Sequence, residues 1–197
     1  MDLSAGRIHY VDEGTGPPIL LIHGTPTWSF EYRHLIRSLA PRWRTIAPDH
    51  LGFGLSSRPP SFAYTPEAHA SILREFVELL GLVRFAFLGH DFGGPIGLPL
   101  CFDPHIEITH LVLLNTWMWP IDDDPRTARG VRLIAGPFGR LLYKYANASL
   151  RLLMPTAYGD RSKLTASIHR QYLSPFRRRD DRVLVLHALR AVARRVA

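Results

Sequence analysis

The stretch LGHDFGG, residues 88–94, ends an apolar run and begins a glycine-rich turn. Residues 85–88 (FAFL), which lead into the turn, have the length and composition of a buried strand, and residues 95–100 follow it with a helical pattern. Glycines on both sides of the turn let the backbone reverse sharply without a side-chain clash. The stretch therefore predicts a strand, a tight turn with Asp91 at its centre, and a helix.

The same alternation extends outward along the chain. We expect further strands at residues 7–12, 19–22, 45–47 and 111–114, and further helices at residues 30–39 and 66–80. Thr65 is a candidate N-cap for the helix at 66–80, and Gly81 lies just past its end. Alternating strands and helices predict an α/β fold, with a mostly parallel sheet flanked by helices.

Polar residues follow four of these strands. They are His23-Gly24-Thr25, Asp49-His50, Asp91-Phe92 and Asn115-Thr116. Parallel sheets bind ligands at the carboxyl ends of their strands, so these clusters predict one functional edge of the sheet.

The chain changes character after Pro120. Residues 122–125 (DDDP) form a polar boundary, and the rest reads as helices interrupted by glycine and proline. We therefore expect a core domain over residues 1–120 and a helical lid over residues 121–197.

Composition narrows the partners and the compartment. The single cysteine, Cys101, excludes a disulfide within the chain and fits a reducing compartment, and the first residues lack a signal-peptide pattern, so we expect a cytoplasmic protein. Residues 1–125 hold 8 Arg and 14 Asp or Glu, a net charge of −6, whereas residues 126–197 hold 16 Lys or Arg and 3 Asp, a net charge of +13. We interpret the basic part as a solvated helical face rather than a nucleic-acid or membrane surface, because no recognition motif or stacking aromatics accompany it.

The turn at Asp91 has the spacing of a nucleophile elbow, in which the reactive side chain stands between a strand and a helix. An aspartate there is ionised without a general base, and it can attack a carbon that carries a leaving group to form an ester. The backbone N–H groups of Thr25 and Phe92 are placed to bind an oxyanion or a halide. The alternative for Asp91 is an N-cap of the following helix, and for His23 we favour a structural role.

Five segments together resemble the haloalkane dehalogenases of the α/β-hydrolase superfamily. They are HGTPTWSFEYRHLI (23–36), APDHLGFGLSSRP (47–59), YTPEAH (64–69), GHDFGGPIGLPL (89–100) and LVLLNTWMWP (111–120). The resemblance covers roughly residues 7 to 125. It implies that Asp91 displaces halide from a small apolar alkyl halide, and that water activated by a histidine then hydrolyses the alkyl ester. We expect no metal or other cofactor, because the histidines and carboxylates lack the spacing of ligand clusters.

The chain departs from that family in three ways. The residue after the nucleophile is commonly tryptophan, whose indole N–H holds the halide; here it is Phe92. Trp117 and Trp119 are candidates for that donor, and the alternative for both, which we favour, is a packing role. Asn115 stands where some members carry the catalytic acid, and the family's late acid and late histidine have no counterpart. We therefore expect a chain that corresponds to the front two-thirds of such a hydrolase, without the C-terminal strands and helices, as a fragment or a frameshift product.

Two alternatives remain open from the sequence. The first is an epoxide hydrolase of the same fold, in which lid tyrosines would donate a proton to the epoxide oxygen; Tyr143, Tyr145, Tyr158 and Tyr172 are the candidates. The second is an inactive chain or a non-enzymatic scaffold, because no general base is evident. The oligomeric state does not follow from the sequence.

Overall fold

A computed structural model of the chain describes residues 1–117, 130, 133–134, 136–184 and 186–187. The chain divides into two compact units, Met1–Met118 and Trp119–Ala197. Residue 119, named above as a possible halide donor, and residues 122–125, the polar boundary, lie outside the described residues.

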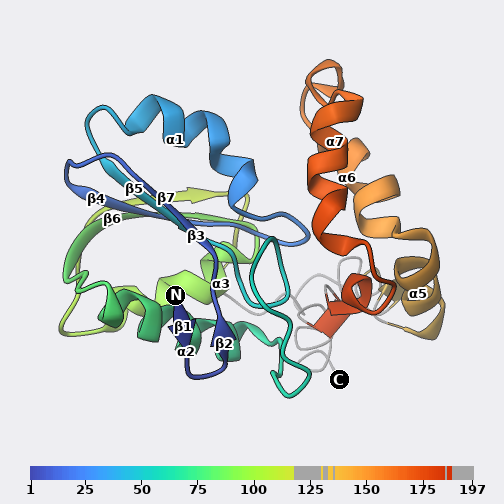
Figure 1. Ribbon diagram of the computed structural model, residues 1–197, viewed down its shortest axis with the longest axis horizontal. Coiled ribbons are helices and arrows are strands. Elements are labelled where there is room, and N and C mark those ends of the chain that lie inside the picture. The colour runs from blue at the N-terminus through green and yellow to red at the C-terminus, as the bar shows by residue number, and fades with distance from the viewer. Residues whose placement is uncertain (118–129, 131–132, 135, 185, 188–197) are drawn as a thin grey trace. The chain divides into compact units, whose positions relative to one another are not determined.

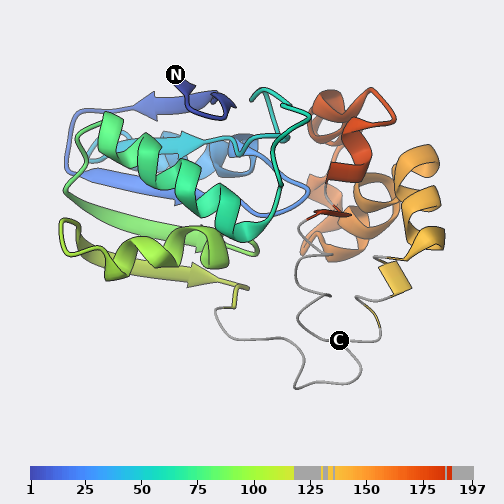
Figure 2. The same cartoon turned by 90° about the horizontal axis from the view of Figure 1, so that it is seen from below.

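The first unit is built on a five-stranded sheet (Figures 1 and 2). Its strands are β3 (Tyr10–Glu13), β4 (Pro18–Ile22), β5 (Arg44–Pro48), β6 (Arg84–His90) and β7 (Glu107–Leu114), in the order β3-β5-β4-β6-β7. All neighbours pair in parallel except β3 and β5, which are antiparallel. Only residues 14–17 join β3 to β4, and so short a loop cannot return the chain for a parallel crossover. The mostly parallel α/β sheet expected from the sequence is confirmed.

The strand expected at residues 7–12 is wrong in part. Gly6–Arg7 form β2, which pairs with β1 (Asp2–Leu3) in a separate two-stranded sheet, and β3 begins only at Tyr10. His9 lies between them, because its N–H donates to Ser56 Oγ at 2.9 Å and its Nδ1 donates to Asp49 Oδ2 at 2.9 Å. The His9 N–H is thus bound by a side chain, whereas the His9 carbonyl still accepts from Asp49 N at 2.8 Å.

Helices cover both faces of the sheet. The 3-10 turn η1 (Ser29–Tyr32) and α1 (Arg33–Leu39) lie on one face, and α2 (Pro66–Leu79) and α3 (Gly93–Gly97) lie on the other (Figure 1). Helix α2 begins where predicted: Thr65 Oγ1 accepts from Ala68 N at 3.3 Å. The predicted helix at 95–100 begins two residues earlier and tightens into the 3-10 helix η2 (Leu98–Phe102), which contains Pro99 in its first turn.

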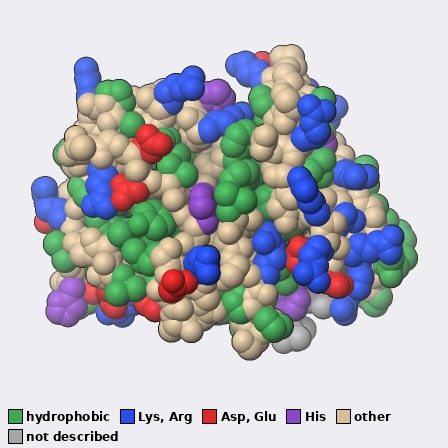
Figure 3. Space-filling model, viewed as in Figure 1, with side chains coloured by type: hydrophobic (Ala, Val, Ile, Leu, Met, Phe, Trp, Pro, Cys, Tyr) green, Lys and Arg blue, Asp and Glu red, His purple; other side chains and the backbone are tan. Residues whose placement is uncertain are grey.

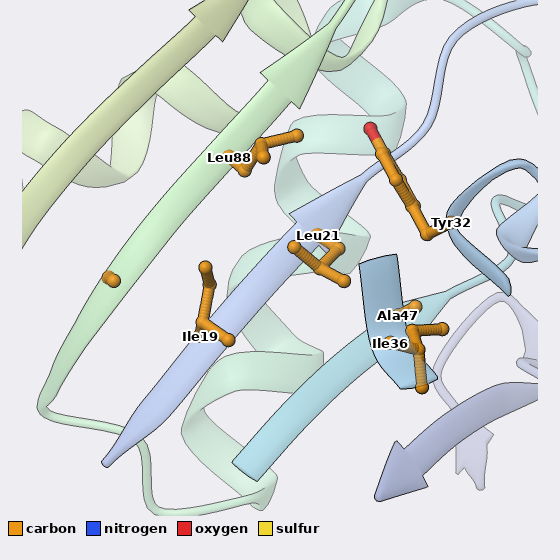
Figure 4. Packing of buried hydrophobic residues seen from close by; sticks show 7 residues of the cluster. Ile19, Leu21, Tyr32, Ile36, Ala47 and Leu88 are labelled. Atoms are coloured by element: carbon orange, nitrogen blue, oxygen red, sulfur yellow. The ribbon is translucent and has the colours of Figure 1, made fainter. Parts of the chain in front are cut away.

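The core on the α1 side is a compact apolar cluster (Figure 4). Ile19 and Leu21 of β4 pack with Leu88 of β6, and Tyr32 and Ile36 from the helical segment lie over them. Burying each such side chain stabilises the fold by roughly 1.5–3 kcal/mol. Tyr32 also donates from its hydroxyl to Ile22 O at 2.8 Å, which ties η1 to the end of β4. The cluster thereby fixes β4, β6 and η1, the elements next to the turn at Asp91.

Strand β7 stands at one end of the sheet and differs from the other parallel strands. Leu111, Val112, Leu113 and Leu114 are 40–49% exposed, whereas Leu20, Leu21 and Ile22 of β4 are fully buried.

The described residues of the second unit form short helical segments joined by turns and bends. Its segments are α5 (Pro137–Leu141), η3 (Leu142–Ala146), η4 (Ser149–Leu153), α6 (Met154–Ala157), η5 (Arg161–Lys163), α7 (Ala166–Leu173), η6 (Ser174–Phe176) and η7 (Asp181–Val183). Lys and Arg side chains gather on its surface (Figure 3), and those of residues 177–179 are exposed. In the part of the chain that is described, no helix has the length and apolarity that crossing a membrane requires.

Candidate active site

The turn after β6 holds Asp91 in an unusual backbone conformation. Its φ is 50°, in the left-handed region that residues with a Cβ seldom adopt. Two contacts hold it there: Asp91 N donates to Leu114 O at 3.2 Å, and Thr116 Oγ1 donates to Asp91 O at 2.6 Å. Such strain persists where the surroundings over-determine the conformation, and it is concentrated at functional sites. The strand–turn–helix predicted around residue 91 therefore has the geometry of a nucleophile elbow.

Two glycines permit the close approach of neighbouring segments to this turn. A Cβ added to Gly24 would lie 2.4 Å from Asp91 Cβ, and one added to Gly93 would lie 2.1 Å from Ile22 O. Both distances are far shorter than the roughly 3.5–4.0 Å at which carbon atoms make their best contact. The loop after β4 and the start of α3 can therefore contact the elbow only because these positions lack side chains.

The Asp91 carboxylate lies against backbone donors. Thr25 N donates to Asp91 Oδ2 at 2.8 Å. Burial raises the pKa of Asp91, which the N–H groups of Phe92 and Thr25 and the charge of His90 counteract; the charge of Glu31 raises it further. The two backbone donors named from the sequence, on Thr25 and Phe92, are thus brought together at this carboxylate, where they favour its ionised form.

Two aromatic rings meet beside the elbow. The Phe92 side chain is 2% exposed, and its ring meets that of Trp117 edge-to-face, with 4.9 Å between centroids and an interplanar angle of 80°. Trp117 follows β7, so the end of that strand brings its indole to the residue after Asp91. Phe92 itself offers no side-chain donor.

His23 is a structural residue of the same edge. It is fully buried; its Nδ1 donates to Gly24 O at 2.8 Å, and its Nε2 accepts from His50 N at 3.0 Å. His50 Nε2 in turn donates to His23 O at 3.1 Å, and burial holds the pKa of His50 well below its usual value. Both imidazoles are engaged in holding two strand ends together, as favoured for His23 from the sequence.

Asp49 also supports the edge. Its carboxylate is fully buried, and it accepts from Ser29 N at 2.7 Å, His9 Nδ1 at 2.9 Å and Leu55 N at 3.0 Å. Burial alone would raise the pKa of Asp49, but the hydrogen bond from His9 and those from the two N–H groups lower it. Asp49 thus fixes the loop after β5 and the start of η1.

An ion pair beside the nucleophile has no signal in the sequence. His90 Nδ1 lies 2.7 Å from Glu31 Oε1, and Thr27 Oγ1 donates to Glu31 Oε2. The hydrogen bond to Glu31 raises the pKa of His90, against the effect of burial. Glu31 and His90 are 59 positions apart, and neither belongs to a spacing pattern that would connect them.

In the described ranges, no group of three or more His, Cys, Asp or Glu side chains is placed to hold a metal ion.

Comparison with known proteins places these features in a family context. Residues 17–186 match the model of the alpha/beta hydrolase fold. The chain is 44% identical over 174 residues to haloalkane dehalogenase 2 of Mycobacterium tuberculosis, a match that covers 88% of this chain and 60% of that protein. It is 35% identical over 109 residues to the soluble epoxide hydrolase of Corynebacterium sp., covering 55% of this chain and 38% of that protein.

A solved structure gives the same picture. The haloalkane dehalogenase DatA of Agrobacterium tumefaciens C58 superposes with a TM-score of 0.83 at 27% identity, covering 94% of this chain and 64% of that one. The chain thus spans about three fifths of the length of the curated dehalogenase that it matches.

Proposed function

Since the chain belongs to the alpha/beta hydrolase fold family, we propose that it carries the nucleophile of a haloalkane dehalogenase-type hydrolase, and that this nucleophile is Asp91. The observation that carries the proposal is the elbow itself, where a strained aspartate at φ 50° presents its carboxylate to Thr25 N at 2.8 Å. The likeness to haloalkane dehalogenase 2 supports this choice among the chemistries of the fold.

The first step is the displacement of halide. An Asp91 carboxylate oxygen attacks the carbon that bears the halogen, the carbon–halogen bond breaks, and its electron pair leaves with the halide ion. The product is an ester between Asp91 and the alkyl group. No proton is transferred in this step, so the nucleophile needs no general base, and the N–H groups of Thr25 and Phe92 favour the ionised carboxylate.

The second step is attack by water on the ester carbonyl carbon. The same two N–H groups are then placed to stabilise the oxyanion of the tetrahedral intermediate. This step also needs a general base. The imidazoles of His23 and His50 are committed to structural hydrogen bonds, and we assign the role to neither.

The departing halide needs a donor that Phe92 does not supply from its side chain. Trp117 is the candidate, because its ring contacts Phe92 directly and its indole carries an N–H. Halide binding by this indole is expected to quench tryptophan fluorescence in the parent chain and to have less effect in Trp117→Phe.

The alkylation step can be tested on the 197-residue chain without turnover. Intact mass is measured after exposure to 1-bromobutane, together with the halide released. One butyl group should be added to the parent chain and none to Asp91→Asn. Asp2→Asn, at an exposed carboxylate whose side chain is 87% accessible, is the matched control and should be alkylated like the parent. Equal alkylation of Asp91→Asn and the parent would refute the assignment of the nucleophile.

Epoxide opening is the second candidate, and the absence of a side-chain donor at Phe92 favours it. An epoxide has no departing halide, and attack by Asp91 instead requires a proton donor for the ring oxygen. Tyr143, Tyr145, Tyr158 and Tyr172 remain the candidates for that donor. Exposure to styrene oxide distinguishes the dehalogenase from the epoxide hydrolase. A chain that forms an adduct containing the whole epoxide, but forms no adduct with 1-bromobutane, would favour the epoxide hydrolase.

A further inference from the structure

Glu31 joins the two segments that form the candidate active site. It lies in η1, and its side chain is only 14% exposed. One carboxylate oxygen, Oε1, lies 2.7 Å from His90 Nδ1 at the end of β6, and the other, Oε2, accepts from Thr27 Oγ1 in the loop after β4. Because a carboxylate only accepts hydrogen bonds, His90 donates from Nδ1 and Thr27 donates its hydroxyl proton.

We propose that Glu31 and His90 form a charge-balanced clamp, in which Glu31 holds the Thr25 loop against the elbow while the imidazolium of His90 cancels the negative charge of Glu31 beside Asp91. The clamp is defined as Thr27, Glu31 and His90. The expected effect of the clamp on the rate of alkylation rests on the proposed function, whereas its expected effect on the pKa of the Asp91 carboxyl does not.

The positioning half of the clamp follows from a continuous chain of contacts. Thr27 N donates to Gly24 O at 3.1 Å, and Thr27 Oγ1 lies 3.0 Å from the same oxygen. Fixing Thr27 therefore fixes the peptide that precedes Thr25, whose N–H contacts Asp91. Glu31 is itself anchored, since its N–H donates to Trp28 O at 2.9 Å.

The charge half follows from the groups that act on Asp91. Among the described residues, His90 from β6 lowers the pKa of the Asp91 carboxyl and Glu31 from η1 raises it. Tyr32 is the other ionisable side chain of η1 that is coupled to Asp91, and burial raises its pKa, which keeps it neutral. The loop after β4 contributes the Thr25 N–H, and the segment after β7 contributes Thr116, neither of which titrates. A negative charge left alone beside a nucleophilic carboxylate would oppose its ionisation.

The test follows the carboxyl carbon of Asp91 by NMR during a pH titration of the 197-residue chain, with the resonance assigned by its loss in Asp91→Asn. His90→Gln leaves Glu31 unbalanced, so the midpoint should rise by about one pH unit. Glu31→Gln leaves the imidazolium unbalanced, so the midpoint should fall. The double variant should return to the parent value.

The parent chain provides a further test that needs no substitution. In its pH titration, the Asp91 resonance should move a second time as His90 loses its proton. A merely structural role would lower the thermal midpoint of the variants without moving the Asp91 titration. The proposal is overturned if the Asp91 midpoint does not move in the single variants or if the double variant does not return to the parent midpoint. It is also overturned if the parent chain shows no second inflection.

Alkylation by 1-bromobutane gives the positioning readout. Thr27→Val should slow adduct formation, and Thr27→Ser, which keeps the hydroxyl, should restore it; equal rates in Thr27→Val and the parent overturn the positioning half. A parent chain that forms no adduct counts against the proposed function instead, and the NMR titration still decides the clamp.

Discussion

Replacing Gly24 with alanine should disable the nucleophile while leaving the fold in place. The added Cβ would lie 2.4 Å from Asp91 Cβ and 2.5 Å from Asp91 Oδ2. Because carbon atoms make their best contact at roughly 3.5–4.0 Å, the carboxylate or the loop must move by about 1 Å or more. A misplacement of about 1 Å at a reacting group can cost 100-fold in rate, so we expect alkylation to slow by about 100-fold. Relief of the clash should cost about 1–3 kcal/mol of stability.

The assay is the first-order rate constant for butyl addition in excess 1-bromobutane, followed by intact mass. Gly159→Ala is the matched control, since a Cβ there meets nothing within 4 Å, and it should react at the parent rate. Thermal unfolding of both variants verifies that the chain remains folded. A folded Gly24→Ala chain alkylated within threefold of the parent would show that the close approach of this loop does not position Asp91.

Two further predictions concern the framework. Asp49→Asn places an amide opposite buried N–H donors and should lower the free energy of unfolding by about 2–3 kcal/mol near pH 6. The His9–Asp49 bond raises the pKa of His9 above 6.5 and lowers that of Asp49 below 3.8. The stability difference between Asp49→Asn and the parent should therefore shrink as the pH rises through the folded pKa of His9, and also as the pH falls below 3.8. Urea titrations in which this stability difference does not change with pH would contradict the prediction. Thr65→Ala removes the side-chain cap on Ala68 N and should lower the free energy of unfolding by about 1 kcal/mol, whereas Thr65→Ser should be close to the parent. Equal urea midpoints for Thr65→Ala and the parent would show that the cap does not stabilise the fold.

The order of the elements was predictable because it rests on local patterns. Short apolar runs such as residues 85–88 become buried strands, and a glycine-flanked turn can follow them only in a few conformations. The predicted strand at 111–114 began four residues too late, because Glu107, Thr109 and His110 are polar and the continuous apolar run starts only at Leu111. The strand expected at 7–12 failed at His9, whose partner Asp49 lies 40 positions away.

At the candidate active site, the sequence by itself determined the residue at the centre of the elbow and the two backbone donors, since Asp91, Thr25 and Phe92 all follow strands whose carboxyl ends share an edge. Only the tertiary structure decided that Glu31 lies against His90 and Thr27, and that Trp117 meets Phe92. The position of a residue at the end of a strand fixes which edge it reaches, because parallel strands run in the same direction. Side-chain pairs depend on which segments pack together and on which side chains fit between them, and that packing brings together residues such as Glu31 and His90, whose separation in the chain carries no pattern.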